Sequence, residues 1–327
     1  MKPKKLLKKS KGHILKNTDF AGMSGEIFKN ISQNGKQTGE IWTENDFTTI
    51  KELAPGTYSK AFQVKENASG IICVMKRITV NEKDTPLNKS GEDQGMMTEL
   101  IMREINTHKL FDHPNIVKLH GYFTDEKYYY LITEYGGDEL FTIVSEMKYE
   151  YTDDEVRDLF RMALTAAAKC HSEGVMHRDI KLENLVYNNE TKILKLIDFG
   201  NAIISDVSNA KAGTHSYMAP EVFNITYDRL IPYGNKVDTW SLGCVFFILT
   251  FKIPPFSLKH LYYINIDKYI IRATNYMLLK KGKLACTFLS SMFIRFPSAR
   301  LTVNELLYHP YFHQPDDLSA LLEATHI

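Results

Sequence analysis

Hydrophobic and polar positions change their spacing several times along the chain, and each change marks a predicted element. Side chains two residues apart share one face of a strand, so short alternating runs indicate half-buried strands. The predicted strands cover residues 47–53, 61–65, 71–78, 119–123 and 128–134. Between the third and fourth runs, apolar residues recur at helical spacing from Met96 to Leu110. This half of the chain therefore predicts a small antiparallel sheet with one helix.

The second half of the chain has a helical pattern. Thr152 and Glu155 match a capping box, in which two side chains satisfy free backbone N–H groups where a helix begins. We expect this helix to reach about His171. Trp240–Thr250 is apolar on every side, which predicts a buried helix, and Leu301–Leu307 predicts a short final one.

These patterns divide the chain into three parts. Residues 1–46 are polar and rich in lysine, and we expect them to form a flexible extension. Residues 47–134 form the smaller lobe and residues 135–327 the larger one. A chain of 327 residues, 44% of them apolar, is long enough for two cores. The predicted fold class is α+β with two lobes.

Composition removes several classes of function. The net charge is +1, so no overall field favours nucleic acid, and the longest apolar run, Leu242–Phe251, is too short to cross a membrane. The four cysteines are far apart, as expected of buried free thiols in a reducing cytoplasmic or nuclear compartment. We expect a monomer. The seven lysines of residues 1–16 are open to three interpretations: a nuclear address, a docking arm for a regulatory partner, or a solubilising tail.

The most specific chemical signal is the run HRDIKLEN at residues 177–184, followed by DFG at residues 198–200. Transfer of a phosphoryl group needs a carboxylate that orients the attacking hydroxyl, oxygen ligands for Mg²⁺, and cations that offset the triphosphate. Asp179 fits the first role, and Asn184 with Asp198 fits the second. Lys181, two residues after Asp179, is placed to reach the transferred phosphate.

Further motifs in a fixed order make residues 47–312 resemble the eukaryotic protein kinase family. They are ICVMK at 72–76, RE at 103–104, HPNIV at 113–117, AGTHSYMAPE at 212–221, DTWSLG at 238–243, SARLT at 298–302 and HPYF at 309–312. The resemblance implies the bilobal protein kinase fold, with a small antiparallel β-sheet N-lobe that carries the αC helix and a larger, mainly helical C-lobe. It also implies ATP with Mg²⁺ or Mn²⁺ as cofactors and proteins as substrates.

The resemblance also implies roles for individual residues of an ATP site. Lys76 would contact the α- and β-phosphates and pair with Glu104. Glu134 and Gly136 would bond adenine through their backbone, Thr133 would stand behind it as the gatekeeper, and Glu139 would contact the ribose. The remaining expected ATP-binding residues are Leu53, Gly56, Ala61, Val74 and Val186.

Other residues are expected to support the site. Asp238 would anchor the catalytic-loop backbone around His177 and Arg178, and Glu221 would form a buried ion pair with Arg300. Lys181 and the Gly213-Thr214 pair resemble Ser/Thr kinases, and Thr214 would bond Asp179 and Lys181. Ser208 is the preferred phosphorylation candidate of the activation segment, with Arg178 to receive the phosphate. Activity without phosphorylation is an equally open alternative.

The sequence departs from the family at several places, and three of them bear on the ATP site. Elsewhere Arg295 takes the place of a common acidic residue, and Glu183 and Glu139 are possible acceptors of a substrate arginine. The glycine loop, APGTYS at residues 54–59, keeps only its middle glycine, and Pro55 has no N–H to offer a phosphate. Ala61 and Val74 exchange the usual large and small residues above adenine, which conserves their summed volume. His108 takes the place of an apolar residue in a column with Leu119, Phe199 and His177, so we expect either a specific hydrogen bond there or an easily disordered helix.

These departures keep a second function open. The leading hypothesis is an active Ser/Thr protein kinase, and the alternative is a pseudokinase scaffold with weak or no ATP turnover. The enzyme is favoured because the chain has all five expected site residues, for which a scaffold has no chemical need: Lys76, Glu104, Asp179, Asn184 and Asp198.

Overall fold

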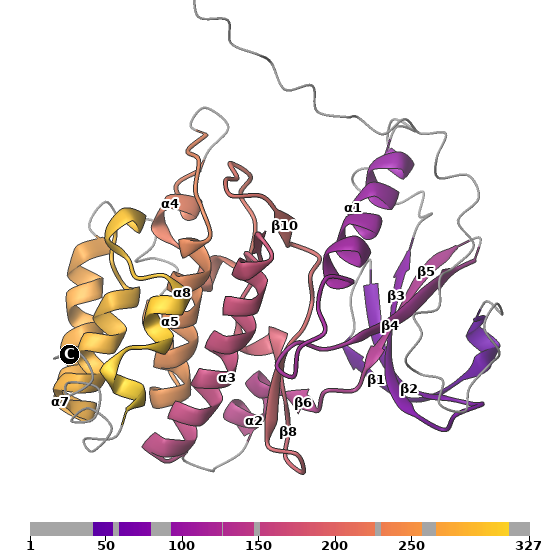
Figure 1. Cartoon of the computed structure of the whole chain (residues 1–327), viewed down its shortest axis with the longest axis horizontal. Coiled ribbons are helices and arrows are strands. Elements are labelled where there is room, and N and C mark those ends of the chain that lie inside the picture. Colours follow the sequence, from indigo (N-terminus) through magenta and orange to yellow (C-terminus); the bar gives the residue numbers. More distant parts are fainter. Residues whose placement is uncertain are drawn as a thin grey trace, which may run out of the picture.

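The computed structural model describes residues 42–54, 59–79, 93–125, 127–146, 151–225, 230–256 and 266–313. They form two lobes, which lie side by side in Figure 1. The smaller lobe contains η2 (Glu44–Asp46), β1 (Phe47–Ala54), β2 (Ser59–Glu66), β3 (Ile72–Thr79), α1 (Asp93–His108), β4 (Leu119–Thr124) and β5 (Tyr128–Glu134).

The larger lobe is mainly helical, with short strands on the side of the smaller lobe (Figure 1). Its helices are α2 (Leu140–Glu146), α3 (Asp153–Ser172), α4 (Pro220–Phe223), α5 (Lys236–Phe251), α7 (Ile266–Met292) and α8 (Val303–Leu307). Its strands are β6 (Asp138–Glu139), β7 (Val175–Met176), β8 (Leu185–Asn188), β9 (Ile193–Leu196) and β10 (Ile203–Ile204). Short 3₁₀ turns are η3 (Leu182–Asn184), η4 (His215–Tyr217), η5 (Pro297–Ala299) and η6 (Pro310–Phe312). The predicted α+β class and the bilobal kinase fold are confirmed.

The five-stranded sheet has the order β1-β2-β3-β5-β4 and is antiparallel throughout. Ala61 is paired with Lys76, and Val74 with Thr133. Paired residues share a face of a sheet, and so do residues two apart along a strand. The register therefore gathers these four side chains on one face.

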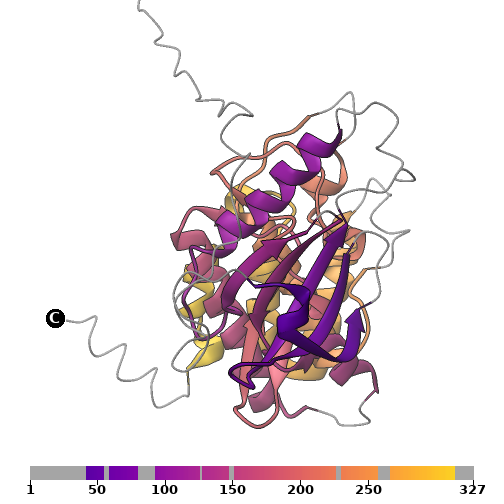
Figure 2. The same ribbon diagram turned by 90° about the vertical axis from the view of Figure 1, so that its right-hand side faces the viewer.

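The opposite face of the sheet is covered by an aromatic cluster. Figure 2 shows the strands of this sheet in front of the larger lobe. Trp42 is 3% exposed, and its ring meets Phe47 edge to face at 5.4 Å between centroids. Phe47 in turn stacks on Phe123 at 6.0 Å. The core of the smaller lobe thus includes Trp42, five residues before the expected lobe boundary, because burial of an apolar ring against the sheet is favourable. Residues 1–41 of the expected extension lie outside the described residues.

Helix α1 packs on the face of the sheet that also carries Lys76. Its buried Ile101, Met102 and Ile105 form one core cluster with Ile78 of β3 and Leu131 of β5. The apolar spacing that predicted this helix is the stripe that holds it to the sheet.

The core of the larger lobe lies between α3 and α5. Phe160 of α3 and Phe246 of α5 meet at 4.9 Å between ring centroids, and both are fully buried. The predicted capping box is present, with Glu155 N donating to Thr152 Oγ1 at 3.2 Å and Thr152 N donating to Glu155 Oε2 at 2.8 Å. The helices predicted near residues 152, 240 and 301 are all confirmed.

Helix α7 was not predicted. It carries apolar side chains on its outer face as well, since Leu279 is 82% exposed while Met277, two residues before it, is fully buried. Gly282 has φ 82°, which kinks the helix in mid-course, and only glycine adopts that conformation readily. Within the described ranges, no helix combines the length and the apolar character needed to span a bilayer.

Candidate active site

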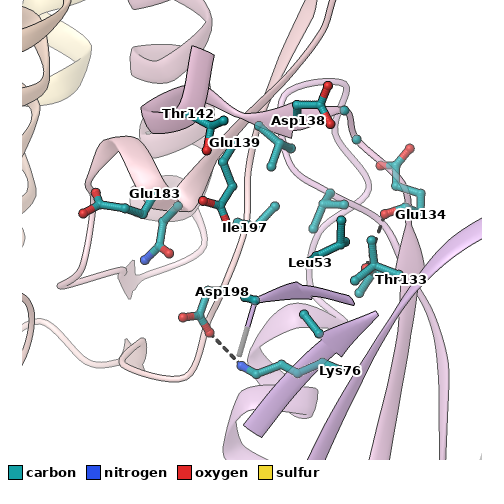
Figure 3. A pocket seen from close by; sticks show the side chains of 18 of the residues that line it. Leu53, Lys76, Thr133, Glu134, Asp138, Glu139, Thr142, Glu183, Ile197 and Asp198 are labelled. Atoms are coloured by element: carbon teal, nitrogen blue, oxygen red, sulfur yellow. Dashed lines mark hydrogen bonds and ion pairs between the residues drawn. The ribbon is translucent and has the colours of Figure 1, made fainter. Parts of the chain in front are cut away.

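A cavity of about 660 Å³ lies between the two lobes (Figure 3). Strands β1 to β3 and α1 supply one wall, while the segment before α2, the catalytic loop and the segment after β9 supply the other. Most of the residues expected at an ATP site line it: Leu53, Ala61, Val74, Lys76, Glu104, Thr133, Glu134, Gly136, Glu139, Lys181, Asn184, Val186 and Asp198. Gly56 lies outside the described residues.

Lys76 joins the two lobes inside this cavity. Its Nζ lies 2.7 Å from Glu104 Oε1 on α1 and 2.8 Å from Asp198 Oδ1, and Figure 3 shows the contact with Asp198. Burial alone would lower the pKa of Lys76, but Glu104 and Asp198 raise it above its usual value. The ammonium cation in turn lowers the pKa of Asp198 far below the usual range. The site therefore contains a fixed cation beside an ionised carboxylate.

Asp198 and Asn184 fit a divalent metal. Asn184 Nδ2 donates to the backbone oxygen of Asp179 at 2.8 Å, so its amide oxygen is the atom left to act as a ligand. An ionised carboxylate and an amide oxygen are ligands suited to Mg²⁺ or Mn²⁺, which are usually held by few protein atoms together with substrate phosphates.

Asp179 is held by several donors at once. Its Oδ1 accepts from Thr214 N at 2.9 Å and from Thr214 Oγ1 at 2.8 Å, and its Oδ2 lies 3.1 Å from Lys181 Nζ. Lys181 Nζ also donates to Thr214 Oγ1 at 2.8 Å, so both contacts expected of Thr214 are present. Asn201 Nδ2 donates to Asp179 Oδ2 at 3.3 Å, a contact that sequence reasoning missed.

Asp238 holds the backbone of the catalytic loop in place. Its carboxylate is fully buried and accepts from His177 N at 2.9 Å and from Arg178 N at 2.8 Å, as expected. Its Oδ2 also bonds His171 Nε2 at 2.8 Å, which was not predicted. Burial alone would raise the pKa of Asp238, but the bond from His171 and its charge lower it. Arg178 has φ 66°, a left-handed conformation that these bonds help to stabilise.

Comparison with known proteins agrees with this geometry. Residues 47–312 match the protein kinase domain. The chain belongs to the protein kinase family.

Several curated kinases are similar to this chain. It is 31% identical over 268 residues to calcium-dependent protein kinase 4 of Plasmodium berghei, an alignment that covers 78% of this chain and 48% of the relative. It is 29% identical over 284 residues to the serine/threonine-protein kinase Aurora-1 of Arabidopsis thaliana, covering 86% of this chain and 90% of the relative. Calcium/calmodulin-dependent protein kinase type 1 of Macrobrachium nipponense is 34% identical over 244 residues, or 72% and 65% of the two chains. The chain spans about half the length of the calcium-dependent kinases it matches, 48% and 44%.

The kinase's hydrophobic column contains the unusual His108. Its ring centroid lies 4.7 Å from that of Phe199, which lies 5.2 Å from that of His177. Burial lowers the pKa of His108 to about 4, so the ring is neutral near pH 7. His108 Nε2 donates to the backbone oxygen of Val117 at 2.7 Å. Of the two expectations for this residue, the specific hydrogen bond is the one the structure has.

The hinge of the kinase has an ion pair that sequence reasoning missed. Glu134 Oε1 accepts from Lys118 N at 2.6 Å and from Lys195 Nζ at 2.7 Å. Lys195 belongs to β9 of the larger lobe, so the Glu134 carboxylate connects both lobes beside the cavity. No motif or spacing links the two residues, which are far apart along the chain.

Two further expected features lie at the activation segment: the Glu221–Arg300 pair and Ser208. Arg300 bonds Glu221 with both terminal nitrogens, at 2.8 and 3.2 Å, and is 1% exposed. Ser208, the expected phosphorylation candidate, is 8% exposed, and its Oγ accepts from Arg178 Nη1 at 3.0 Å. The Ser208 hydroxyl is therefore closed to another enzyme in this conformation.

Proposed function

We propose that this protein is an ATP-dependent serine/threonine-protein kinase, which transfers the γ-phosphate of ATP to hydroxyl groups of protein substrates. The observation that carries this proposal is that Lys76, Asn184 and Asp198 line one interlobe cavity. Asp179 is not among the lining residues but is bonded to Asn184 directly beside them. These residues come from both lobes, and phosphoryl transfer depends on positioning and charge more than on any other protein contribution.

In this mechanism the substrate hydroxyl donates a hydrogen bond to Asp179, which orients it toward the phosphorus and accepts its proton. Lys181 lies beside Asp179 and offsets charge on the transferred phosphate. Lys76, fixed between Glu104 and Asp198, binds the α- and β-phosphates. Asn184 and Asp198 would hold the metal, which supplies positive charge to the triphosphate.

The apolar part of the cavity suits a purine. Ala61 and Val74 lie on the same face of the sheet as Lys76, and Val186 of β8 lines the opposite wall. We propose that these three side chains enclose adenine, with the backbone of Glu134 and Gly136 as its hydrogen-bond partners. Thr133 would stand behind the base, and Leu53 and Glu139 would border the base and the ribose.

The substrate is proposed to be a protein, and a basic one. Glu139 and Glu183 both line the cavity, at the end away from Thr133 and Glu134 (Figure 3). Burial and the negative charge of Glu183 raise the pKa of Glu139. Two carboxylates that repel each other would bind an arginine of a peptide favourably. A regulatory partner at the basic residues 1–16 and a cytoplasmic or nuclear location complete the proposal.

A pseudokinase remains the second candidate, because the glycine loop APGTYS departs from the family. One experiment separates the two functions. The full chain is incubated with γ-labelled ATP, Mg²⁺ and generic protein substrates, beside Asp198→Ala and Asp179→Asn. We expect label transfer by the wild type and a loss of about a thousandfold in each variant. Equal label with all three proteins would remove the kinase and leave the scaffold.

A further inference from the structure

Arg178 donates hydrogen bonds to three acceptors within the protein. Its Nε donates to the backbone oxygen of Asn201 at 2.7 Å, and its Nη1 donates to Ser208 Oγ at 3.0 Å and to the Tyr233 hydroxyl at 3.4 Å. The residue is 8% exposed. A buried guanidinium is costly unless its N–H groups are bonded, so these three acceptors stabilise its position.

Ser208 and Tyr233 are also joined through their backbones. Ser208 N donates to Tyr233 O at 2.9 Å and Tyr233 N donates to Ser208 O at 2.8 Å, which is an isolated antiparallel bridge. The Tyr233 hydroxyl donates to Ala210 O at 2.6 Å, so its lone pairs are left to accept from Arg178. We call Arg178, Ser208, Tyr233 and Ala210 the clasp. It fastens the activation segment to the catalytic loop and to the segment before α5.

The clasp is connected to Asp179 by two short routes. Asn201 accepts from Arg178 through its backbone oxygen, while its side chain donates to Asp179 Oδ2 at 3.3 Å. On the other side, Ala210 lies four residues before Thr214, which bonds Asp179 Oδ1. Both groups that orient the Asp179 carboxylate from outside the catalytic loop are therefore held by segments that the clasp fixes.

We propose that Ser208 and Tyr233 are positioning residues whose hydroxyls, and not a phosphate, hold Arg178 and the activation segment in the arrangement needed for phosphoryl transfer. This inference rests on the proposed kinase function and defines how that site is regulated. The kinase is then active as synthesised, and its Ser208 contributes as an unmodified serine.

A phosphate on Ser208 is the competing occupant. Arg103 of α1 is a second cation near Arg178. Burial lowers the pKa of Arg103, and so does the neighbouring positive charge of Arg178. Its Nε is buried and has no hydrogen-bond partner in the described part of the chain. A phosphoserine would find these two cations, but it would first have to leave the closed position that Ser208 occupies. The two arrangements predict opposite effects of a phosphatase.

The decisive test compares enzymes that differ only in phosphate or in one hydroxyl. Wild-type protein is prepared with and without a broad phosphatase, and its intact mass is measured. We expect the phosphate-free enzyme to keep its kcat within about twofold of the untreated enzyme. We expect Ser208→Ala and Tyr233→Phe each to lower kcat by about tenfold with little change in the KM for ATP, because a bond to a buried charge is lost outside the nucleotide pocket. Ser208→Thr, which keeps a hydroxyl, should restore most of the activity.

Ser205→Ala is the matched control. Ser205 lies in the same segment, and its hydroxyl donates to Val207 O at 2.8 Å, outside the clasp. Its removal should leave kcat unchanged. A large loss of activity on dephosphorylation, or full activity of both Ser208→Ala and Tyr233→Phe, would overturn the proposal.

Hydrogen exchange separates the clasp from the kinase activity. In nucleotide-free, phosphate-free protein, the amides of Ser208 and Tyr233 should exchange slowly, because each donates to the other's carbonyl. Tyr233→Phe should speed exchange over residues 203–214 by about tenfold and leave α5 unchanged. This readout needs no phosphoryl transfer, so an inactive protein with protected amides would count against the kinase function alone. Unprotected amides in the wild type would overturn the clasp.

Discussion

Thr214 bonds one oxygen of Asp179 twice, through its backbone N–H at 2.9 Å and its hydroxyl at 2.8 Å. This contact is possible because Gly213 has φ 102°, and a Cβ there would lie 2.3 Å from the backbone oxygen of Arg178. The activation segment thus reaches the catalytic loop through a glycine and fixes the carboxylate with the next residue. The orientation of Asp179 is set by a residue 35 positions away along the chain.

Removal of the Thr214 hydroxyl should therefore impair turnover. Thr214→Val keeps the shape and the backbone bond but removes the bonds to Asp179 and Lys181. We expect kcat to fall by about ten- to a hundredfold, with little change in the KM for ATP. Thr214→Ser is the control and should retain most of the activity. Equal kcat values in the Val and Ser variants would show that the hydroxyl has no part in turnover.

Lys76 should be needed for catalysis, because it connects Glu104 of the smaller lobe with Asp198 of the larger lobe. Lys76→Met removes the cation between Glu104 and Asp198 and leaves two carboxylates facing one another. We expect a loss of about a hundredfold or more in kcat/KM, because charge stabilisation of the triphosphate is lost. Nucleotide titration followed by thermal shift gives a second readout. The control is Lys169→Met, since Lys169 pairs with Glu173 at one end of α3 and neither residue lines the cavity. An active Lys76→Met enzyme would contradict the proposed role.

The Glu221–Arg300 pair should contribute to the free energy of unfolding and have no direct part in phosphoryl transfer. Arg300→Met leaves the Glu221 carboxylate without its partner, and breaking a buried pair costs about 3–5 kcal/mol. The measurement is the free energy of unfolding in urea. The Arg295–Asp267 pair is the comparison, because its side chains are 44% and 50% exposed. Arg295→Met should cost less than about 1 kcal/mol, and similar losses in both variants would contradict this difference.

Glu139 and Glu183, the two acids proposed to bind an arginine of the peptide, should select the substrate. Glu183→Gln removes one negative charge without changing the shape of the side chain. We expect kcat/KM for arginine-containing peptides to fall by about tenfold, and kcat/KM for neutral peptides to stay within about twofold. The ratio of the two values is the measurement. An unchanged ratio would mean that Glu183 does not contact the peptide.

Much of the site could be predicted from the sequence because its chemistry lies in short runs. Asp179, Lys181 and Asn184 are close neighbours in one loop, so their types and spacing identify them together. Tyr233 and Lys195 could not be predicted, since each meets its partner only through the folded chain and neither belongs to a local pattern. Asn201 directly follows the DFG run, so its position next to the site was visible in the sequence. Its contact with Asp179 was not, because the two residues are 22 positions apart.

The fold divides in the same way. The strands around Lys76 alternate in part because one face carries the cavity and the other meets the aromatic cluster, and this partial alternation predicts them. Trp42 falls in the predicted extension because an isolated aromatic residue in a polar stretch shows no periodic pattern that would predict a strand or a helix. Trp42 is buried because it packs on Phe47, which in turn stacks on Phe123 at the outer face of the sheet. Contacts of this kind follow from tertiary packing and leave no local mark in the sequence.

His108 should make stability depend on pH in a defined window. Its pKa is lowered by burial from 6.5 to about 4, so between these values the unfolded chain binds a proton that the folded kinase does not. The unfolded state therefore gains stability as the pH falls through this window, and the folded kinase loses up to about 3 kcal/mol. Below about pH 4 both states carry the proton and this contribution stays constant.

The check is the slope of Tm against pH in wild type and in His108→Leu. The variant should lose part of the slope between pH 6.5 and about 4, since leucine cannot titrate. It should not lose all of it, because burial also lowers the pKa of His120 to about 4. The absolute stability of the variant is not the readout, since Val117 O loses its donor in the same substitution. A slope identical to that of the wild type would mean that His108 takes up its proton at the same pH in the folded and unfolded states, so that burial does not lower its pKa.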